Sequence, residues 1–267
     1  MKRILLSIWI LCVSLSILGQ EELWCKRGEK RIYGMLYRPE KAEGKLPLVI
    51  ISHGFGGTNQ WGKPYAEALT QRGYMVYCFD FCGGGNYSKS DGKTTEMSVF
   101  SERDDLRAVL SQLRQRPDVD TQRITLMGES QGGIVTAITA VEVEPLIHDI
   151  ILFYPAFSIP EDSKRRYPNP DALPEETEIW GVRLGRTYAE SFVDYNVYDV
   201  IAPFSKPVLI VHGDADRIVP LAYGERAAQI YKDATFHVLH GIDHGYQGIA
   251  QWLAIQLVME FLEKQSQ

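Results

Sequence analysis

Gly128-Glu129-Ser130-Gln131-Gly132 stands between a short apolar run, 124–127, and a helical pattern over 131–141. A Gly-x-Ser-x-Gly pattern between a strand and a helix is typical of a sharp turn that projects the serine above a sheet edge. The glycines let the backbone turn without a clash, and the helix start offers unpaired N–H groups to developing negative charge. We therefore interpret Ser130 as a nucleophile, the alternative being a bystander in a glycine-rich turn.

Outward from this motif, short apolar runs alternate with amphipathic ones. Strands are expected at 23–27 and 31–37, which pair across a turn, and at 46–52, 75–79, 124–127, 150–154, 208–212 and 235–239. Helices are expected at 65–72, around 106–113, and at 131–141, 221–231 and 249–262. The inward face of the last helix is expected to consist of Ile249, Trp252, Leu253, Leu257 and Phe261. This alternation predicts an α/β fold, with a mostly parallel sheet flanked by helices and a ligand site beyond the carboxyl ends of its strands.

The alternation stops between 155 and 203, in a stretch rich in proline, charge and aromatic residues. An interruption of this length is too long for an ordinary connection, so we predict a cap inserted at about 156–203 and folded over the sheet edge. The rest of 20–267 is expected to form one domain with this insertion.

The N-terminus has the composition of a secretory signal peptide. Lys2 and Arg3 precede an apolar run over 4–18, and the small Gly19 comes before a polar stretch. A membrane anchor is the alternative, but the run is short for the roughly 20 residues that span a bilayer. We predict that 1–19 is removed, that the protein is exported to the periplasm or the medium, and that no stable membrane insertion follows.

Bulk properties exclude some partners. The formal net charge is −6, and no run of Lys or Arg stands out, so nucleic acid and anionic membranes are not expected to bind. Cys25, Cys78 and Cys82 are odd in number, and no cysteine–histidine cluster has zinc-ligand spacing. We expect neither a metal nor an organic cofactor, and interpret Cys78 as a buried thiol.

A serine nucleophile needs a base, and the chain has six histidines. Four of them lie at or beside predicted strands and are interpreted as structural: His53, His148, His212 and His237. His240 directly follows the last predicted strand, whereas His244 lies in Gly241-Ile242-Asp243-His244-Gly245, a loop free to reach over the sheet edge. We predict His244 as the base, with His240 as the alternative.

The acid that orients the imidazole is expected in 212–220, which follows the penultimate strand and contains two aspartates. Asp216 lies further into this loop and is predicted to be the acid, whereas Asp214 is expected to tie the turn. The oxyanion of a tetrahedral intermediate needs N–H donors, and we predict the backbone N–H groups of Gln131 and Phe55 for this role.

With these segments the chain resembles the α/β-hydrolase superfamily along nearly all of 20–267. The resemblance rests on His53-Gly54-Phe55-Gly56-Gly57, the 128–133 motif, 212–220 and Asp243-His244-Gly245. Within that superfamily the chain is most similar to the bacterial cinnamoyl (feruloyl) esterases. The narrower similarity is carried by the His-Gly-Phe loop, Gln131 after the serine, Phe204-Ser205-Lys206-Pro207 and the placement of the cap.

The resemblance implies that Asp162 and Tyr188 of the cap bind the ring hydroxyl of an aromatic acyl group. The alternative is that both are polar surface groups of the cap. The chain also departs from the family, because Cys82-Gly83-Gly84-Gly85 replaces a Gly-His-Gly loop and Glu129 stands where a histidine is frequent.

The predicted activity is hydrolysis of carboxylic esters through an acyl-enzyme, with a small or polysaccharide-linked aromatic ester as substrate. A prolyl-oligopeptidase-like serine peptidase, an acetyl esterase or lipase, and a non-catalytic binding protein that keeps the fold are the alternatives.

Overall fold

The structure is a computed structural model that describes residues 18–39, 41 and 43–266. The predicted signal peptide lies outside these residues except for Leu18 and Gly19, which begin the first strand. The strands of the main sheet are β1 (Leu18–Arg27), β2 (Lys30–Pro39), β3 (Leu46–Ser52), β4 (Met75–Phe79), β5 (Val119–Glu129), β6 (Asp149–Phe153), β9 (Val208–Gly213) and β10 (Ala234–Leu239).

These eight strands form one sheet in the order β1-β2-β4-β3-β5-β6-β9-β10. Only β2 runs against its neighbours, since β1–β2 and β2–β4 are antiparallel and the other pairs are parallel. The mostly parallel sheet expected from the alternation is therefore confirmed, including the hairpin of the first two strands.

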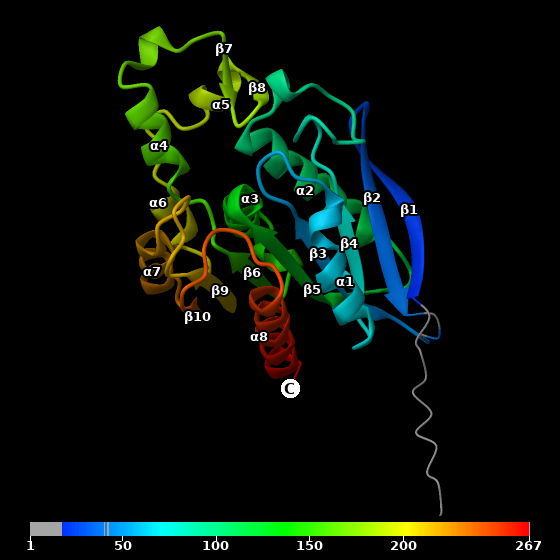
Figure 1. Ribbon diagram of the computed structural model, residues 1–267. Helices are drawn as coiled ribbons and strands as arrows, with labels where there is room; N and C mark the ends of the chain where they lie inside the picture. Colours follow the sequence, from blue (N-terminus) through cyan, green and yellow to red (C-terminus); the bar gives the residue numbers. More distant parts are fainter. Residues whose placement is uncertain (1–17, 40, 42, 267) are drawn as a thin grey trace, which may run out of the picture.

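Helices cover both faces of the sheet (Figure 1). The five helices outside the cap are α1 (Lys63–Thr70), α2 (Val99–Leu113), α3 (Ser130–Glu142), α7 (Leu221–Ile230) and α8 (Ile249–Gln265). One apolar core lies between the sheet and α2, α3 and α7, and a second lies between the opposite face and α1 and α8. The central strands β3, β4, β6 and β9 are buried on both faces, so their short runs are apolar rather than alternating.

The segment between β6 and β9 lies above the carboxyl ends of the strands (Figure 1). It contains α4 (Ile159–Arg166), β7 (Glu176–Ile179), β8 (Val182–Gly185), α5 (Arg186–Glu190) and α6 (Val197–Ile201). The two short strands form an antiparallel pair of their own. This placement agrees with a cap folded over the sheet edge.

The expected inward face of α8 is confirmed for Phe261, which is buried, but is wrong for Ile249 and Trp252, which are 79% and 59% exposed. Ala250, Ala254 and Val258 are buried against the sheet instead. Small alanines allow the helix to lie close to the strands. Because α8 is apolar on more than one side, the sequence pattern did not single out the contact face.

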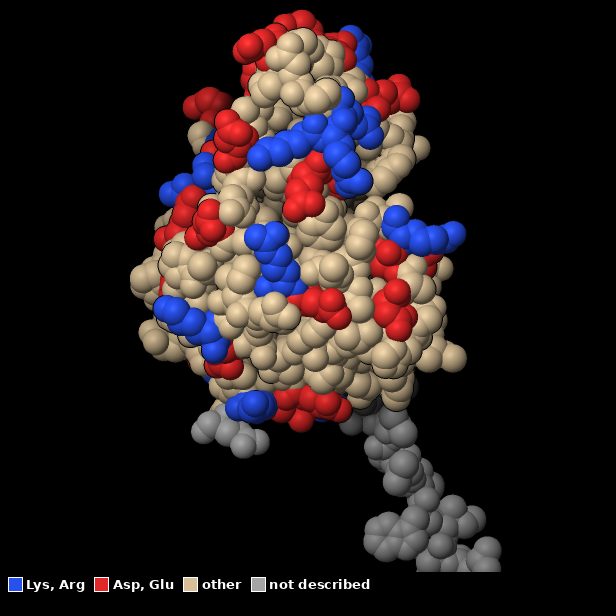
Figure 2. All heavy atoms as spheres, turned by 90° about the vertical axis from the view of Figure 1, so that its left-hand side faces the viewer, with Lys and Arg blue, Asp and Glu red and all other residues tan. Residues whose placement is uncertain are grey.

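Cys25, Cys78 and Cys82 are buried free thiols. Burial raises the pKa of Cys78, which agrees with the predicted thiol role. Among the described helices none has both the length and the apolar character needed to cross a membrane. On the face shown in Figure 2, acidic and basic side chains are interspersed.

Candidate active site

Ser130 lies on a strained turn between β5 and α3. Its φ is +48°, in the left-handed region that a residue with a Cβ rarely adopts. A side chain at Gly128 would overlap the carbonyl oxygen of Gly132, and one at Gly132 would overlap the backbone of Ser52 and His53. The two glycines are thus required by close backbone approach, and the turn stores strain of a kind that clusters at functional sites.

The structure brings Ser130, His244 and Asp216 together at the carboxyl edge of the sheet. His244 Nε2 lies 3.0 Å from Ser130 Oγ, and His244 Nδ1 lies 2.8 Å from Asp216 Oδ2. The three residues follow β5, β10 and β9, whose carboxyl ends lie at the same edge because the strands are parallel. This is the arrangement in which a carboxylate orients an imidazole toward a hydroxyl.

Asp216 is held as a carboxylate. Its Oδ1 accepts hydrogen bonds from the N–H groups of Ile218 and Val219, at 2.9 and 2.8 Å, and His212 Nε2 lies 3.4 Å from Oδ2. Burial opposes its ionisation, but the hydrogen bonds from His212, His244 and Val219 outweigh it and lower the pKa of Asp216. The group is therefore charged at neutral pH and able to stabilise an imidazolium.

His240, the alternative base, lies on the surface and does not contact Ser130. His240 Nδ1 is 2.7 Å from Asp214 Oδ2, and the side chain of His240 is 86% exposed. Asp214 also accepts the N–H of Gly241, so it ties two neighbouring loops rather than its own turn. The second imidazole–carboxylate pair is a surface pair with no contact to Ser130.

His53 and His212 brace loops as expected. His53 Nδ1 lies 2.7 Å from the carbonyl oxygen of Gly54, and its Nε2 accepts the N–H of Phe81. His212 Nε2 lies 2.8 Å from the carbonyl oxygen of Val219. Both rings are buried, and both hold the loops that carry the other site residues.

The predicted oxyanion donors lie beside the serine. The loop of Gly54 and Phe55 is so close that a Cβ at Gly54 would be 3.2 Å from Ser130 Cβ. Phe55 N–H has no acceptor among the described residues. Gln131 is the second residue of α3, so its N–H precedes the first intrahelical hydrogen bond. Two unpaired donors are thus available next to Ser130.

Glu129 forms a buried network that the sequence did not reveal. Its Oε1 accepts the N–H of Gly54 at 3.1 Å, and its Oε2 accepts the hydroxyl of Tyr154. The ring of Tyr154 in turn packs edge-on against His244, with centroids 4.6 Å apart. The carboxyl group of Glu129 therefore connects the loop of Gly54 with Tyr154, which packs against the imidazole of His244.

Burial raises the pKa of Glu129 to about 7, while the hydrogen bonds from Tyr154 and Gly54 oppose the increase. In the folded protein Glu129 therefore keeps its proton up to about pH 7, whereas in the unfolded chain it loses this proton at its ordinary pKa of 4.5. It follows that this group's contribution to the free energy of unfolding falls as pH rises from about 4.5 to 7. At about 1.4 kcal/mol per pH unit the loss is about 3 kcal/mol.

We expect Glu129→Gln to remove this pH dependence, because an amide fills the same space without titrating. Urea unfolding at several pH values between 4.5 and 7.5 measures the effect as the difference between the two proteins. Parallel stability profiles would show that Glu129 is not the group that titrates.

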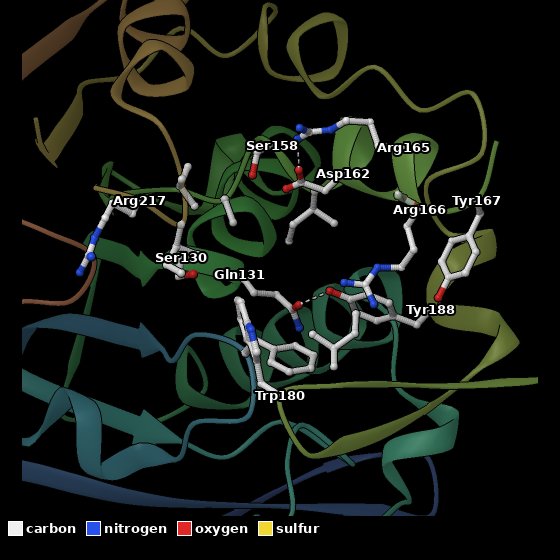
Figure 3. Close-up of a pocket in the computed structure, with 17 residues that line it drawn as sticks. Ser130, Gln131, Ser158, Asp162, Arg165, Arg166, Tyr167, Trp180, Tyr188 and Arg217 are labelled. Carbon is white, nitrogen blue, oxygen red and sulfur yellow. Dashed lines mark hydrogen bonds and ion pairs between the residues drawn. The ribbon is translucent and has the colours of Figure 1, made fainter. Parts of the chain in front are cut away.

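A cavity of about 610 Å³ opens between Ser130 and the cap (Figure 3). Gln131 forms part of its floor: Oε1 accepts the hydroxyl of Tyr188 at 2.7 Å, and Nε2 donates to Glu102 Oε2 at 2.8 Å. Burial raises the pKa of Glu102 well above its ordinary range, and the amide of Gln131 is its hydrogen-bond partner. The cap and α2 are thus connected to the residue after the serine.

Asp162 and Tyr188 both line this cavity, but each is engaged elsewhere. Asp162 pairs with Arg165 one turn along α4, and Tyr188 donates its hydroxyl to Gln131. Figure 3 shows them on different sides of the cavity. The structure therefore places both residues at the substrate space without bringing their side chains into contact.

The glycine loop at 82–85 packs against the oxyanion loop. A Cβ at Gly85 would lie 2.8 Å from the carbonyl oxygen of Gly56, so the close approach depends on the missing side chain. The departure from the family pattern thus leaves small residues beside Phe55. In the described part of the chain, no group of three or more His, Cys, Asp or Glu is arranged to hold a metal ion.

Fold and site geometry together define an α/β-hydrolase, and the comparisons with known proteins identify its family. A family model described as serine aminopeptidase, S33 matches residues 45–189, more than half of the chain, so the chain belongs to this hydrolase family. An uncharacterized protein of Mycobacterium tuberculosis (strain H37Rv) is 29% identical over 79% of this chain and 67% of its own length. YfhR of Escherichia coli (strain K12), also uncharacterized, is 27% identical over 72% of this chain, and the match spans 60% of that relative.

Among solved structures, Est1E from Butyrivibrio proteoclasticus with bound ferulic acid has a TM-score of 0.84. It is 26% identical, and the match covers 92% of this chain and all of the other. The predicted relationship to the feruloyl esterases is confirmed.

Proposed function

We propose that this protein is a serine ester hydrolase in which Ser130, His244 and Asp216 form a catalytic triad. The observation that carries the proposal is the pair of contacts that His244 makes, at 3.0 Å to Ser130 Oγ and 2.8 Å to Asp216. The strained backbone at Ser130 and the two unpaired N–H donors beside it support the same role.

In the first half-reaction, Ser130 Oγ attacks the ester carbonyl as its proton moves to His244 Nε2. The negative charge on the tetrahedral oxygen is met by the N–H groups of Phe55 and Gln131. The charged imidazole, stabilised by Asp216, then gives its proton to the leaving alcohol, and the acyl-enzyme remains. Water repeats these steps, with His244 again as base, and releases the acid.

We further propose an aromatic acyl group of the cinnamoyl type as the substrate. The cavity is lined by Phe55, Trp180 and Tyr188, and Phe55 packs edge-on against the other two rings. Est1E, which shares the fold, binds ferulic acid. Asp162 and Tyr188 are the proposed contacts to the ring substituents, and polysaccharide-linked esters are the proposed natural form.

A peptidase of the same fold is the second candidate, because the matching family model bears the name serine aminopeptidase. An aminopeptidase needs a carboxylate for the substrate amine, and the cavity carboxylate Asp162 is already paired with Arg165. This pairing favours the esterase.

Parallel assays with methyl ferulate, 4-nitrophenyl acetate and amino-acid amides test the choice. We expect methyl ferulate to have the highest kcat/KM. Faster turnover of amides would reverse the assignment, and a preference for acetate would indicate an acetyl esterase. A fluorophosphonate probe is expected to label Ser130, and failure to label would favour a binding protein.

We also propose export after removal of 1–19, as the N-terminal sequence predicts. Expression in a Gram-negative host and mass spectrometry of the periplasmic fraction test this point. We expect a chain that begins near Gln20, and recovery of the whole chain from the cytoplasm would contradict it.

A further inference from the structure

Among the described residues that line the cavity between Ser130 and the cap, one cation has no hydrogen-bond or ion-pair partner. Three arginines line the cavity, and two of them are neutralised: Arg165 by Asp162, and Arg217 by Asp243. Arg166 makes no hydrogen bond or ion pair with any described residue. The polar lining therefore carries a surplus positive charge at a single side chain.

Arg166 ends α4, whose last turn also contains Lys164 and Arg165. Figure 3 shows its guanidinium turned toward the hydroxyl of Tyr188. The two groups are close enough for the charge of Arg166 to act on the pKa of Tyr188, which burial raises. On the upper part of the face in Figure 2, basic side chains lie next to acidic ones.

The neighbours of Arg166 do not occupy its N–H groups. The proton of Tyr188 is used by Gln131, and the carboxylate of Asp162 is used by Arg165. A planar guanidinium with free N–H groups matches the two oxygens of a carboxylate. The rings of Phe55 and Trp180 pack edge-on against each other and form an aromatic wall of the same cavity, on which a flat ring can pack.

We propose that Arg166 forms a carboxylate-binding subsite and that the preferred ester has an aromatic acyl group with a carboxylate at its far end. This inference rests on the proposed esterase function and names the substrate class for the same site. The guanidinium binds the carboxylate, the aromatic wall holds the ring, and the ester carbonyl reaches Ser130.

Two cinnamate esters of equal size test the subsite. Methyl 4-carboxycinnamate has the carboxylate, and methyl 4-carbamoylcinnamate replaces it with a neutral amide. The readout is the ratio of their kcat/KM values within each protein. We expect the wild-type ratio to be about tenfold or more at low salt, and to fall as salt screens the exposed guanidinium.

Arg166→Gln is expected to bring this ratio near 1, Arg166→Lys to retain part of it, and Arg166→Glu to reverse it. Lys164→Gln is the matched control, because it removes one positive charge from the same helical turn outside the cavity. It is expected to keep the wild-type ratio.

A wild-type ratio near 1, or an unchanged ratio in Arg166→Gln, would overturn the subsite while the esterase assignment stands. A similar loss in Lys164→Gln would show general attraction by the cap rather than a subsite. If neither ester is cleaved and a fluorophosphonate does not label Ser130, the esterase function fails and the subsite fails with it.

Discussion

Replacement of Ser130 by alanine is expected to lower kcat for ester hydrolysis by about a millionfold, the loss found when the serine of a comparable triad is removed. The variant lacks the proposed nucleophile, Ser130 Oγ, which lies 3.0 Å from His244 Nε2. Residual catalysis is expected from the oxyanion donors and substrate binding alone.

Steady-state kinetics with methyl ferulate measure this loss. The fluorophosphonate probe is expected not to label the variant. Thermal unfolding provides the control, because alanine is as compatible as serine with the backbone at φ +48°. A melting temperature close to that of the wild type separates lost chemistry from lost folding. Near-normal ester hydrolysis by this variant would rule out the mechanism.

His244→Ala is expected to reduce kcat by a similar factor, since nucleophile and base act as a unit. The chain contains its own control in His240, another histidine paired with an aspartate but placed on the surface. His240→Ala is therefore expected to retain kcat/KM within about twofold. Equal losses in the two variants would contradict the assignment of His244.

Asp216 and Asp214, the aspartates paired with these two histidines, allow the same comparison. Asp216→Asn should lower kcat by about ten-thousandfold, because an amide favours the wrong imidazole tautomer. Asp214→Asn should leave kcat unchanged, since Asp214 contacts only His240 and Gly241. Steady-state kcat with methyl ferulate measures both variants, and equal losses would contradict the assignment of Asp216.

The sequence was sufficient to place the proposed catalytic residues because each follows an apolar strand, either directly or within the next few residues. Parallel strands bring such ends to one edge, so Ser130, Asp216 and His244 meet although they are far apart along the chain. The strands of the main sheet were predicted within five residues, the largest errors being the starts of β1, at Leu18 rather than 23, and of β5, at Val119 rather than 124. Helix α2 begins at Val99, seven residues before the predicted start, and the two strands of the cap were not predicted.

Three other features of the structure have no recognisable pattern in the sequence, so they could not be predicted. The network of Glu129 joins residues from three separate segments, and local spacing does not reveal a buried carboxylate with two donors. The contact face of α8 was missed because apolar residues lie on both of its sides. The unpaired guanidinium of Arg166 could not be predicted, because the sequence does not show that Asp162 pairs with Arg165 and Asp243 with Arg217.

The cap leaves the sheet after β6 and returns at β9, and these two strands are direct neighbours. Both ends of the insertion are therefore anchored to adjacent strands, and its length can change without altering the order or pairing of the sheet. A change of length or sequence within the insertion is expected to reshape the cavity, which the cap lines, and to leave the turn at Ser130 on its own strand and helix.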